Sequence, residues 1–193
     1  MKKKSLFKIL LILLIFFIFL YLITGFLNKR YYNYYPTLYL YPNNEKDIKI
    51  VEKYNKKRLE NNEINKFVKL TDKSCIYGFL EEIDDLSIDE LISIENNINP
   101  IIIFFKNLFN RPRPWQINNN LNHYNSISAF TPSFPSGHSA QAQYIAKRLS
   151  EKYPQKKKQL YKVAEKCGLA RVYGGLHFLS DHEFSKFIVS MIP

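Results

Sequence analysis

Residues 135–184 read PSGHSAQAQYIAKRLSEKYPQKKKQLYKVAEKCGLARVYGGLHFLSDHEF. Ser136 is a preferred amino-terminal cap, and it predicts a helix of about fifteen residues immediately after it. Pro154 is placed to open a second helix that ends near residue 171, and residues 177–190 predict a third. No stretch of useful length alternates apolar and polar residues in the manner of a strand. We therefore predict an all-α fold, a helical bundle.

The sequence before this segment also has helical spacing. We expect helices over residues 45–61, 64–70, 74–82, 88–98 and 101–109, followed by a loop over residues 115–135. Ser87 and Glu90 form a capping box at the start of one of these helices, and Pro100 would be the first residue of the next. The apolar run over 101–109 is too short to cross a bilayer, so it predicts a helix of the protein core.

The amino-terminal part has the composition of a membrane anchor. Residues 9–27 contain no charged side chain, and a helix of this length, at about 1.5 Å per residue, matches the hydrocarbon thickness of a bilayer. A cleaved secretory signal is the alternative, but the apolar run is longer than usual and no A-x-A site follows it. More lysines precede the run than follow it, which favours an amino terminus in the cytoplasm and a helical domain in an extracytoplasmic or lumenal space.

The chain divides into an anchor over residues 1–30, a tyrosine-rich stalk over residues 31–44 and a helical domain over residues 45–193. The net charge of the whole chain is +11, but residues 1–30 hold six of the 28 basic residues and none of the 17 acidic ones. A net charge of +5 is left for residues 31–193. This mildly basic domain suits an anionic small molecule, and we expect no nucleic-acid partner.

Two cysteines, Cys75 and Cys167, are too few for a disulfide framework. We expect two free, packed thiols, and a single disulfide bond is the alternative. No C-x-x-C pair or cysteine–histidine cluster indicates a zinc site.

Two groups of residues suggest an anion site. Lys106 lies in the apolar run, and the proline-flanked Arg113 follows seven residues later, which would place cations beside an apolar wall. A solvated helix end is the alternative. Ser136, Gly137 and His138 open a helix, where free N–H groups and the helix dipole attract an anion and glycine allows its close approach. A plain helix cap is the alternative.

The third group is Arg171, His177 and Asp181. On a helix, His177 and Asp181 would lie at positions i and i+4, so the carboxylate can accept a hydrogen bond from one ring nitrogen and leave the other as a nucleophile. Such a pair can also be an inert surface contact or two ligands of a metal.

The three groups occur in the order Lys106-x6-Arg113-Pro114, Pro135-Ser136-Gly137-His138 and Arg171-x5-His177-x3-Asp181. This order resembles the tripartite signature of the type 2 phosphatidic acid phosphatase superfamily, and the resemblance covers residues 106–181. It implies an all-helical phosphoric monoester hydrolase that uses a phosphohistidine intermediate and no metal or other cofactor. Its substrate would be a phosphorylated small molecule or a lipid phosphate, and water-soluble phosphomonoesters are slightly favoured.

The resemblance also implies a role for each motif residue. His177 would be the nucleophile, Asp181 its orienting carboxylate and His138 the general acid for the leaving oxygen. The phosphate cradle would consist of Lys106, Arg113, Arg171 and the backbone at Ser136 and Gly137. These cations and N–H donors suit a phosphoryl group, which carries its charge on three equatorial oxygens.

One position departs from the family pattern, because Ala170 stands where the family has serine before the third-motif arginine. We expect the loss of one hydroxyl contact there. Two other functions stay open: a non-catalytic, membrane-tethered phosphate-binding or interaction module, and a vanadate-dependent haloperoxidase. His123 and His182 fit no motif position and are interpreted as ordinary polar residues.

Overall fold

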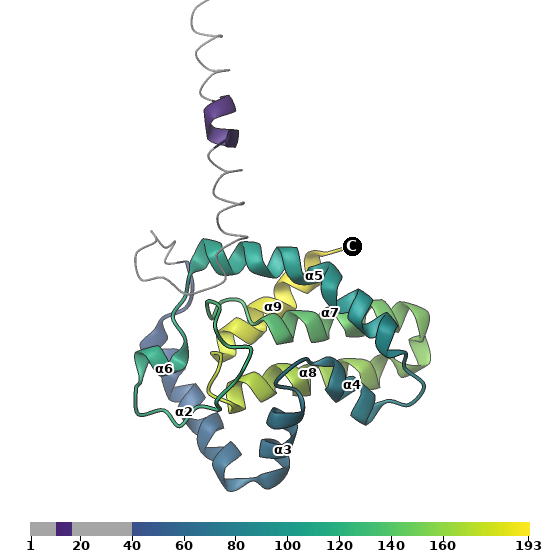
Figure 1. Cartoon of the computed structure of the whole chain (residues 1–193), viewed down its shortest axis with the longest axis horizontal. Coiled ribbons are helices and arrows are strands. Elements are labelled where there is room, and N and C mark those ends of the chain that lie inside the picture. The colour runs from purple at the N-terminus through teal and green to yellow at the C-terminus, as the bar shows by residue number, and fades with distance from the viewer. Residues whose placement is uncertain (1–10, 17–39) are drawn as a thin grey trace, which may run out of the picture.

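The computed structural model describes residues 11–16 and 40–193. Within residues 40–193 the regular elements are all helical, which confirms the all-α prediction. They are α2 (Asn44–Glu60), α3 (Asn62–Leu70), α4 (Ile76–Glu82), α5 (Ile88–Phe109), α6 (Pro114–Ile117), α7 (Gly137–Lys152), the 3-10 turn η1 (Pro154–Lys156), α8 (Lys157–Tyr173) and α9 (Leu179–Met191), labelled in Figure 1.

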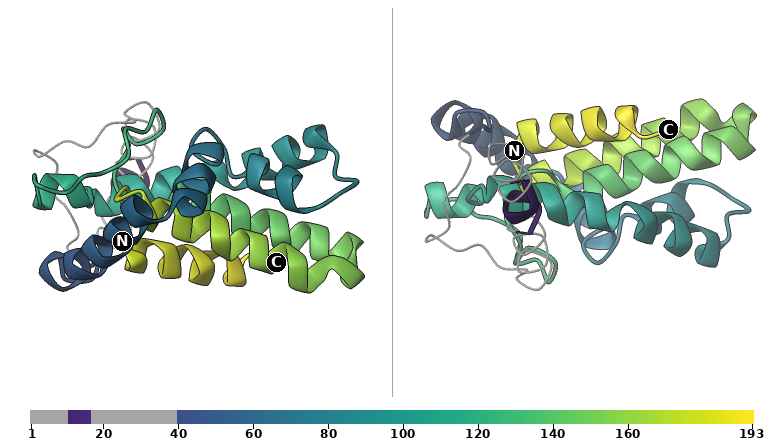
Figure 2. Two further views of the ribbon diagram at one scale, coloured as in Figure 1. Left: turned by 90° about the horizontal axis from the view of Figure 1, so that it is seen from below. Right: turned by 90° about the horizontal axis from the view of Figure 1, so that it is seen from above.

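Helices α7 and α8 form an antiparallel pair at the centre of the bundle (Figure 2). Helices α5 and α9 pack against α7, whereas α2, α3 and α4 pack against α8. The largest apolar cluster includes residues from both central helices: Ala142, Ile145, Ala146, Leu149, Leu160, Val163, Ala164 and Cys167. The segment over 135–184 therefore supplies the centre of the fold.

The predicted start of α7 is confirmed, because the Ser136 hydroxyl caps the helix and accepts a hydrogen bond from the Ser139 N–H (3.4 Å). Pro154 opens the short turn η1, and α8 follows it as far as Tyr173. Ser87 caps α5, as predicted, by accepting a hydrogen bond from the Glu90 N–H.

Helix α5 corrects the predicted break at Pro100. The structure has one continuous helix, Ile88–Phe109, with Pro100 inside it. The buried side chains Leu91, Ile98 and Ile102 follow one helical face across the proline, so packing maintains a single helix axis. Pro100 and Asn96 are both exposed, so water can satisfy the Asn96 carbonyl group that a proline leaves without its helical donor.

Two other predicted boundaries are wrong. The loop expected over residues 115–135 begins with the short helix α6, which Pro114 opens. Helix α9 begins at Leu179 and not at residue 177, because the glycine-containing turn after α8, in which Gly175 has φ of 68°, is followed by an extended residue, Phe178. His177 therefore precedes the helix, although it still contacts Asp181 (3.1 Å).

Most of the predicted membrane anchor lies outside the described residues. Residues 11–16 are helical and their side chains are exposed. Among residues 11–16 and 40–193, no helix is both long and apolar enough to cross a membrane. The predicted stalk over 31–44 is described only from residue 40 onward. The span over 9–27 and the stalk therefore stay predictions.

Both cysteines are free and buried, as expected. The Cys167 thiol donates a weak hydrogen bond to the Cys75 carbonyl oxygen (3.6 Å). Burial raises the pKa of Cys167 to about 12 and also raises the pKa of Cys75. The thiols therefore stay protonated and are part of the packed core.

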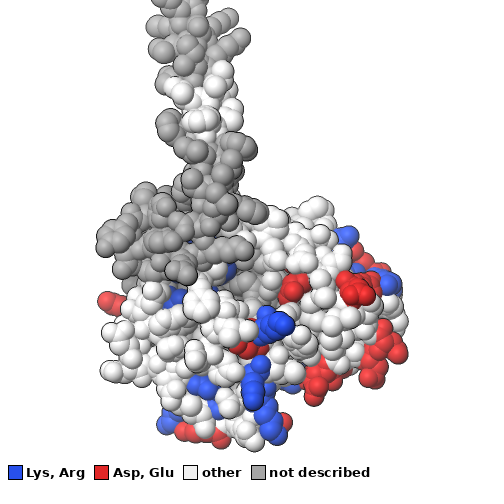
Figure 3. All heavy atoms as spheres, viewed as in Figure 1, with Lys and Arg blue, Asp and Glu red and all other residues white. Residues whose placement is uncertain are grey.

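Charged side chains of both signs are interspersed over the face of the helical domain in Figure 3. No single-sign field covers the described surface on this face. The expectation that the chain has no nucleic-acid partner stays a prediction.

Gly168 allows α8 to approach the fully buried imidazole of His182 on α9. A Cβ atom at Gly168 would lie 2.2 Å from His182 Nδ1. We expect Gly168→Ala to lower the free energy of unfolding by about 1–3 kcal/mol, because the buried ring has to move. Thermal unfolding checks this, with Gly137→Ala as the control, since a Cβ there would lie at an ordinary 3.7 Å from Ile102. Equal unfolding temperatures for the two variants would contradict the prediction.

Candidate active site

The three sequence motifs meet at one end of the bundle. Figure 1 shows that α5 and α8 end, and α7 and α9 begin, on the same side of the molecule. The motif residues lie at or next to these helix ends: Lys106 in the last turn of α5, Arg113 before α6, Ser136, Gly137 and His138 at the start of α7, Arg171 in the last turn of α8, and His177 and Asp181 around the start of α9. The amino-terminal ends of α7 and α9 present unpaired N–H groups, which suit an anion, and the last turns of α5 and α8 carry the cations Lys106 and Arg171.

The geometry of His177 defines its tautomer. Its Nδ1 lies 3.1 Å from Asp181 Oδ2, and its Nε2 lies 2.8 Å from Arg113 Nη1. Because a guanidinium group can only donate, Nε2 must carry the lone pair and Nδ1 the proton. The imidazole is therefore neutral, with a nucleophilic nitrogen directed at a cation.

Electrostatics favour the same protonation state. Burial lowers the pKa of His177 well below its usual value, and the cations Arg113, Lys106 and Arg171 lower it further. Burial also raises the pKa of Asp181, although Arg111 opposes that rise. The pair thus holds an imidazole that is neutral at physiological pH.

Asp181 uses both carboxylate oxygens. Oδ2 accepts hydrogen bonds from Ser133 Oγ (2.5 Å) and the Phe178 N–H (2.9 Å) in addition to His177 Nδ1. Oδ1 accepts one from Arg111 Nη1 (2.6 Å). The orientation of the carboxylate is therefore fixed from several sides.

His138 lies in the first turn of α7. Its Nε2 is 3.0 Å from the Asp72 carbonyl oxygen, which can only accept, so Nε2 carries the proton in this arrangement. Burial and then Arg171 lower the pKa of His138 well below its usual value. A bound dianion would raise that pKa again, because an opposite charge stabilises the imidazolium.

Three buried cations surround the two histidines. Arg171 donates to Asp72 Oδ1 (3.0 Å), Arg113 donates to Leu176 O (2.7 Å), and Lys106 donates to Pro132 O. Of these cations, Arg171 alone has a carboxylate partner within the described residues. Burial and the neighbouring cations lower the pKa values of Lys106 and Arg113, the latter to about 9. An anion would relieve this repulsion.

Arg171 also has a buried nitrogen, Nε, without a hydrogen-bond partner in the described part of the chain. Buried donors of this kind are rare in folded proteins. The other guanidinium nitrogens bind Asp72, Ser126 and Ser128. The residues present therefore fit a phosphate or a similar oxyanion.

The start of α7 completes the cradle. The Ser136 N–H donates to the Asp181 carbonyl oxygen (3.2 Å), so it is already engaged. Within the described residues, the amides of Gly137 and His138 have no acceptor, as expected for the first turn of a helix. These two N–H groups, more than the predicted Ser136 amide, are available to an anion.

The family model of the PAP2 superfamily matches residues 95–192. The chain belongs to the PAP2 superfamily. This is a phosphatase-type superfamily, so the recognition based on three motifs is confirmed. The match begins within α5 and extends through α9, and it contains every motif residue. A comparison with curated proteins found no match.

Several residues of this PAP2 protein's site have no role in the sequence analysis. Asp72 binds Arg171 and, through its carbonyl group, His138. Ser133 and Arg111 bind Asp181. Arg111 could have been suspected from its place between the first-motif residues, but nothing in the sequence near Asp72 or Ser133 indicates their partners.

Ala170 corrects the expected loss of a phosphate contact. Its side chain is buried in the main apolar cluster and lines a cavity between α3, α4 and α8. A hydroxyl group at this position would face the apolar cluster or that cavity, which neither His138 nor His177 lines. The PAP2 site therefore loses no visible phosphate donor through this substitution.

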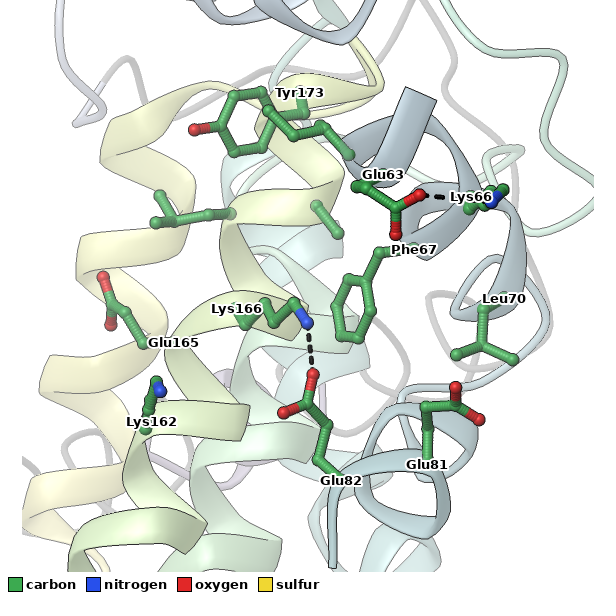
Figure 4. A pocket seen from close by; sticks show the side chains of 13 residues that line it. Glu63, Lys66, Phe67, Leu70, Glu81, Glu82, Lys162, Glu165, Lys166 and Tyr173 are labelled. Atoms are coloured by element: carbon green, nitrogen blue, oxygen red, sulfur yellow. Dashed lines mark hydrogen bonds and ion pairs between the residues drawn. The ribbon is translucent and has the colours of Figure 1, made fainter. Parts of the chain in front are cut away.

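That cavity has a volume of about 940 Å³ and lies apart from the site of the three motifs. Figure 4 shows it between α3, α4 and α8, with Phe67 and Tyr173 on its walls and the Lys166–Glu82 ion pair across it. Neither histidine of the PAP2 motifs lines it. The candidate active site is therefore located by the clustered motif residues and not by this cavity.

One cluster outside the site has metal-ligand character. Glu165, His182 and Glu183 place one ligand atom each within 4.8 Å of the others. The Lys186 ammonium group already pairs with both carboxylates (3.3 and 3.2 Å). We interpret the cluster as an ion-pair network that links α8 to α9.

Gly137→Ala tests the close approach of phosphate to α7. The new Cβ would lie 3.8 Å from Lys106 Cε, an ordinary contact, so stability should be unchanged. We expect kcat/KM to fall by about 10²-fold. The added methyl group would keep the phosphoryl group from its closest approach to the first turn of α7, and a small misplacement of a reacting group is costly. Steady-state kinetics together with thermal unfolding check this. Full activity would show that the phosphate does not approach this helix.

Proposed function

We propose that this PAP2 protein hydrolyses phosphomonoesters through a phosphohistidine on His177. The observation that carries the proposal is the neutral His177, whose Nε2 lone pair is directed at Arg113 (2.8 Å). The buried cations Lys106, Arg113 and Arg171 support it, because they match the charge of a phosphoryl group. An intact nucleophile–carboxylate pair argues against a non-catalytic phosphate-binding module.

In the first step, His177 Nε2 attacks phosphorus and the bond from phosphorus to the ester oxygen breaks. His138 gives a proton to that oxygen, so an alcohol leaves and the phosphoryl group stays on His177. The electron pair of the broken bond goes to the alcohol oxygen. Asp181 accepts the hydrogen bond from Nδ1–H and stabilises the positive charge that develops on the ring.

In the second step, a water molecule attacks the phosphohistidine. His138, now neutral, accepts a proton from that water, and the bond between Nε2 and phosphorus breaks. The products are inorganic phosphate and neutral His177. Arg113, Arg171, Lys106 and the first amides of α7 would stabilise the charge on the equatorial oxygens in both steps, so the proposed mechanism requires no metal or other cofactor.

The substrate is proposed to be a phosphomonoester with an apolar group, either a water-soluble ester or a lipid phosphate. Residues 126–131 form the loop that contacts Arg113 and Arg171. In this loop, residues that bind the arginines alternate with exposed apolar side chains. Ser128 and Thr131 bind the arginines, whereas Ile127 and Phe130 are 67% and 69% exposed. Exposed apolar side chains beside a phosphate cradle suit an apolar leaving group.

Membrane attachment through residues 9–27 is the second part of the proposal. It rests on the length and the uncharged composition of that run. The lysines before it favour a cytoplasmic amino terminus, so the active site would be extracytoplasmic or lumenal. Attachment is tested by retention of the full chain in carbonate-washed membranes. Orientation is tested by protection of residues 40–193 from added protease in sealed vesicles whose cytoplasmic face is outward.

The hydrolytic activity is tested with the full chain in detergent, with chelator present, on a panel of aryl, alkyl and lipid phosphomonoesters. We expect release of inorganic phosphate at the same rate with and without chelator. Loss of activity that zinc or magnesium restores would overturn the cofactor-free mechanism. Absence of hydrolysis with every ester, combined with binding of inorganic phosphate, would favour the non-catalytic module.

A further inference from the structure

Arg111 is fully buried beside the candidate active site, but it does not belong to the phosphate cradle. A guanidinium group has five N–H donors, and the structure gives Arg111 five acceptors. They are Asp181 Oδ1 (2.6 Å), Asp47 Oδ2 (3.0 Å), Asn44 Oδ1 (2.9 Å), Ser180 Oγ (2.7 Å) and Pro42 O (3.2 Å). A saturated guanidinium group has no donor left for a phosphate oxygen.

Three of these acceptors come from residues 42–47, at the start of α2. These residues lie outside the family match over 95–192. The flat face of the guanidinium group packs on the Phe178 ring, with 3.9 Å from Cζ to the ring centroid. Hydrogen bonds therefore prevent the guanidinium group from moving within its own plane, and the Phe178 ring prevents it from moving out of that plane on one side.

We propose that the first turn of α2 is part of the catalytic apparatus, because Asn44 and Asp47 hold Arg111 against Asp181 and Arg111 thereby positions the His177–Asp181 pair. The inference rests on the proposed function. It makes Arg111 a positioning residue, since it acts through Asp181. It also means that residues 42–47, which lie outside the family match, are required by a site whose motif residues all lie within that match.

The physical argument concerns the two oxygens of Asp181. Arg111 binds Oδ1, which leaves Oδ2 directed at His177 Nδ1. Without this anchor, the carboxylate can rotate about its Cβ–Cγ bond, and the Nδ1 proton loses a fixed acceptor. The Nε2 lone pair then no longer has a single orientation toward the phosphorus atom, and small misplacements of reacting groups are costly.

Asp47 has a second effect, through charge. Arg111 is paired with two carboxylates, those of Asp47 and Asp181. Asp47 also accepts a hydrogen bond from Ser180, one residue before Asp181. Removal of the Asp47 charge leaves a buried cation with one ionic partner. The guanidinium group is then less firmly held in the position in which it orients Asp181 toward His177.

The variants are Asp47→Asn, Asn44→Ala and Arg111→Lys in the full chain, and Glu45→Gln is the matched control. Glu45 lies in the same turn of α2 but is exposed. We expect Asp47→Asn and Arg111→Lys to lower kcat for an aryl phosphate by about 10²-fold. KM and the affinity for inorganic phosphate should stay unchanged, because the cradle cations are intact. Asn44→Ala should have a smaller effect, and Glu45→Gln none.

Arg111→Gln adds a pH readout. The charged groups that interact with Asp181 are Arg111, Lys106 and Arg113, and the titratable His177 is its hydrogen-bond partner. Loss of the Arg111 cation raises the pKa of the buried carboxyl group, so the acid limb of the kcat profile should move to higher pH. Arg111→Lys keeps the charge and should return the acid limb toward its original position without restoring kcat fully. A role limited to stability would move neither quantity.

A second measurement is independent of activity. The Nδ1 proton of His177 should give a downfield NMR resonance in the wild type, which broadens or shifts in Asp47→Asn and Arg111→Lys but not in Glu45→Gln. Unchanged kcat and an unchanged resonance in both variants would overturn the proposal. If the wild type hydrolyses no ester, the proposed function fails, and the resonance alone decides the positioning role. If phosphate binding is lost as well, Arg111 supports the cradle as a whole and the specific proposal is wrong.

Discussion

We expect His177→Ala to abolish formation of a phosphoenzyme with every substrate. Among the side chains that the structure describes, His177 is the one whose ring nitrogen has its lone pair directed at Arg113. His138 does not replace it, because the proposed mechanism uses His138 as the proton donor and its Nε2 is directed at the Asp72 carbonyl oxygen (3.0 Å) and not at Arg113. Acid-labile label from an activated aryl phosphate, recovered on His177 in the wild type and absent in the variant, is the measurement.

His138→Ala should be selective. An alkyl phosphate has a poor leaving group that requires a proton, so its hydrolysis should fall by about 10²–10⁴-fold. An activated aryl phosphate requires this proton far less, and the variant should still become labelled. The phosphohistidine should also accumulate, because the same residue accepts a proton from water in the second step.

The two histidine variants together test the assignment of roles. His123→Ala is a suitable control, because its exposed ring stacks on Trp115 (4.7 Å between ring centroids) and lies outside the three motifs. Equal losses of aryl and alkyl hydrolysis in both active-site variants, with no label on His177, would contradict the assignment even if the protein proves to be a phosphatase.

Asp181→Asn should lower kcat by about 10⁴-fold, as expected when the carboxylate that orients a catalytic imidazole becomes an amide. The amide NH2 group must face either Arg111 at Oδ1 or the donors Ser133 and Phe178 N–H at Oδ2. Either arrangement sets a donor against a donor. With the NH2 group at the Oδ2 position, the proton on His177 Nδ1 loses its acceptor, and with the NH2 group at the Oδ1 position, the contact with Arg111 that fixes the side chain is lost.

The same substitution should cost about 1–3 kcal/mol of unfolding free energy, because a buried donor stays unpaired. Ser133→Ala is the matched control, since it removes one donor and leaves the carboxylate in place. It should lower kcat far less than Asp181→Asn. If the two variants lose activity equally, Asp181 has a structural role and does not orient His177. Thermal unfolding at the assay pH separates loss of activity from loss of fold.

The sequence by itself determined the central helices and the motif positions. Ser136 and Pro154 act through local hydrogen bonds and backbone angles, so their effects on α7 and α8 could be predicted from neighbouring residues. The spacing of the three motifs was sufficient to recognise the superfamily, because three such motifs in this order are unlikely to coincide by chance. The helix break at Pro100 was predicted wrongly for the opposite reason: packing along the buried face of α5 outweighs the local preference of a proline.

Only the tertiary structure decided the partners of the motif residues. Asp72 is 99 residues from Arg171 in the sequence, and Asp47 is 64 residues from Arg111. No local pattern encodes such pairs, since each depends on how the helix ends meet. The tautomer of His177 was decided in the same way, because a guanidinium group 2.8 Å from Nε2 leaves that nitrogen as the acceptor. The residue types therefore follow from the sequence, whereas the protonation state and orientation of the reacting groups follow from contacts that only the folded chain makes.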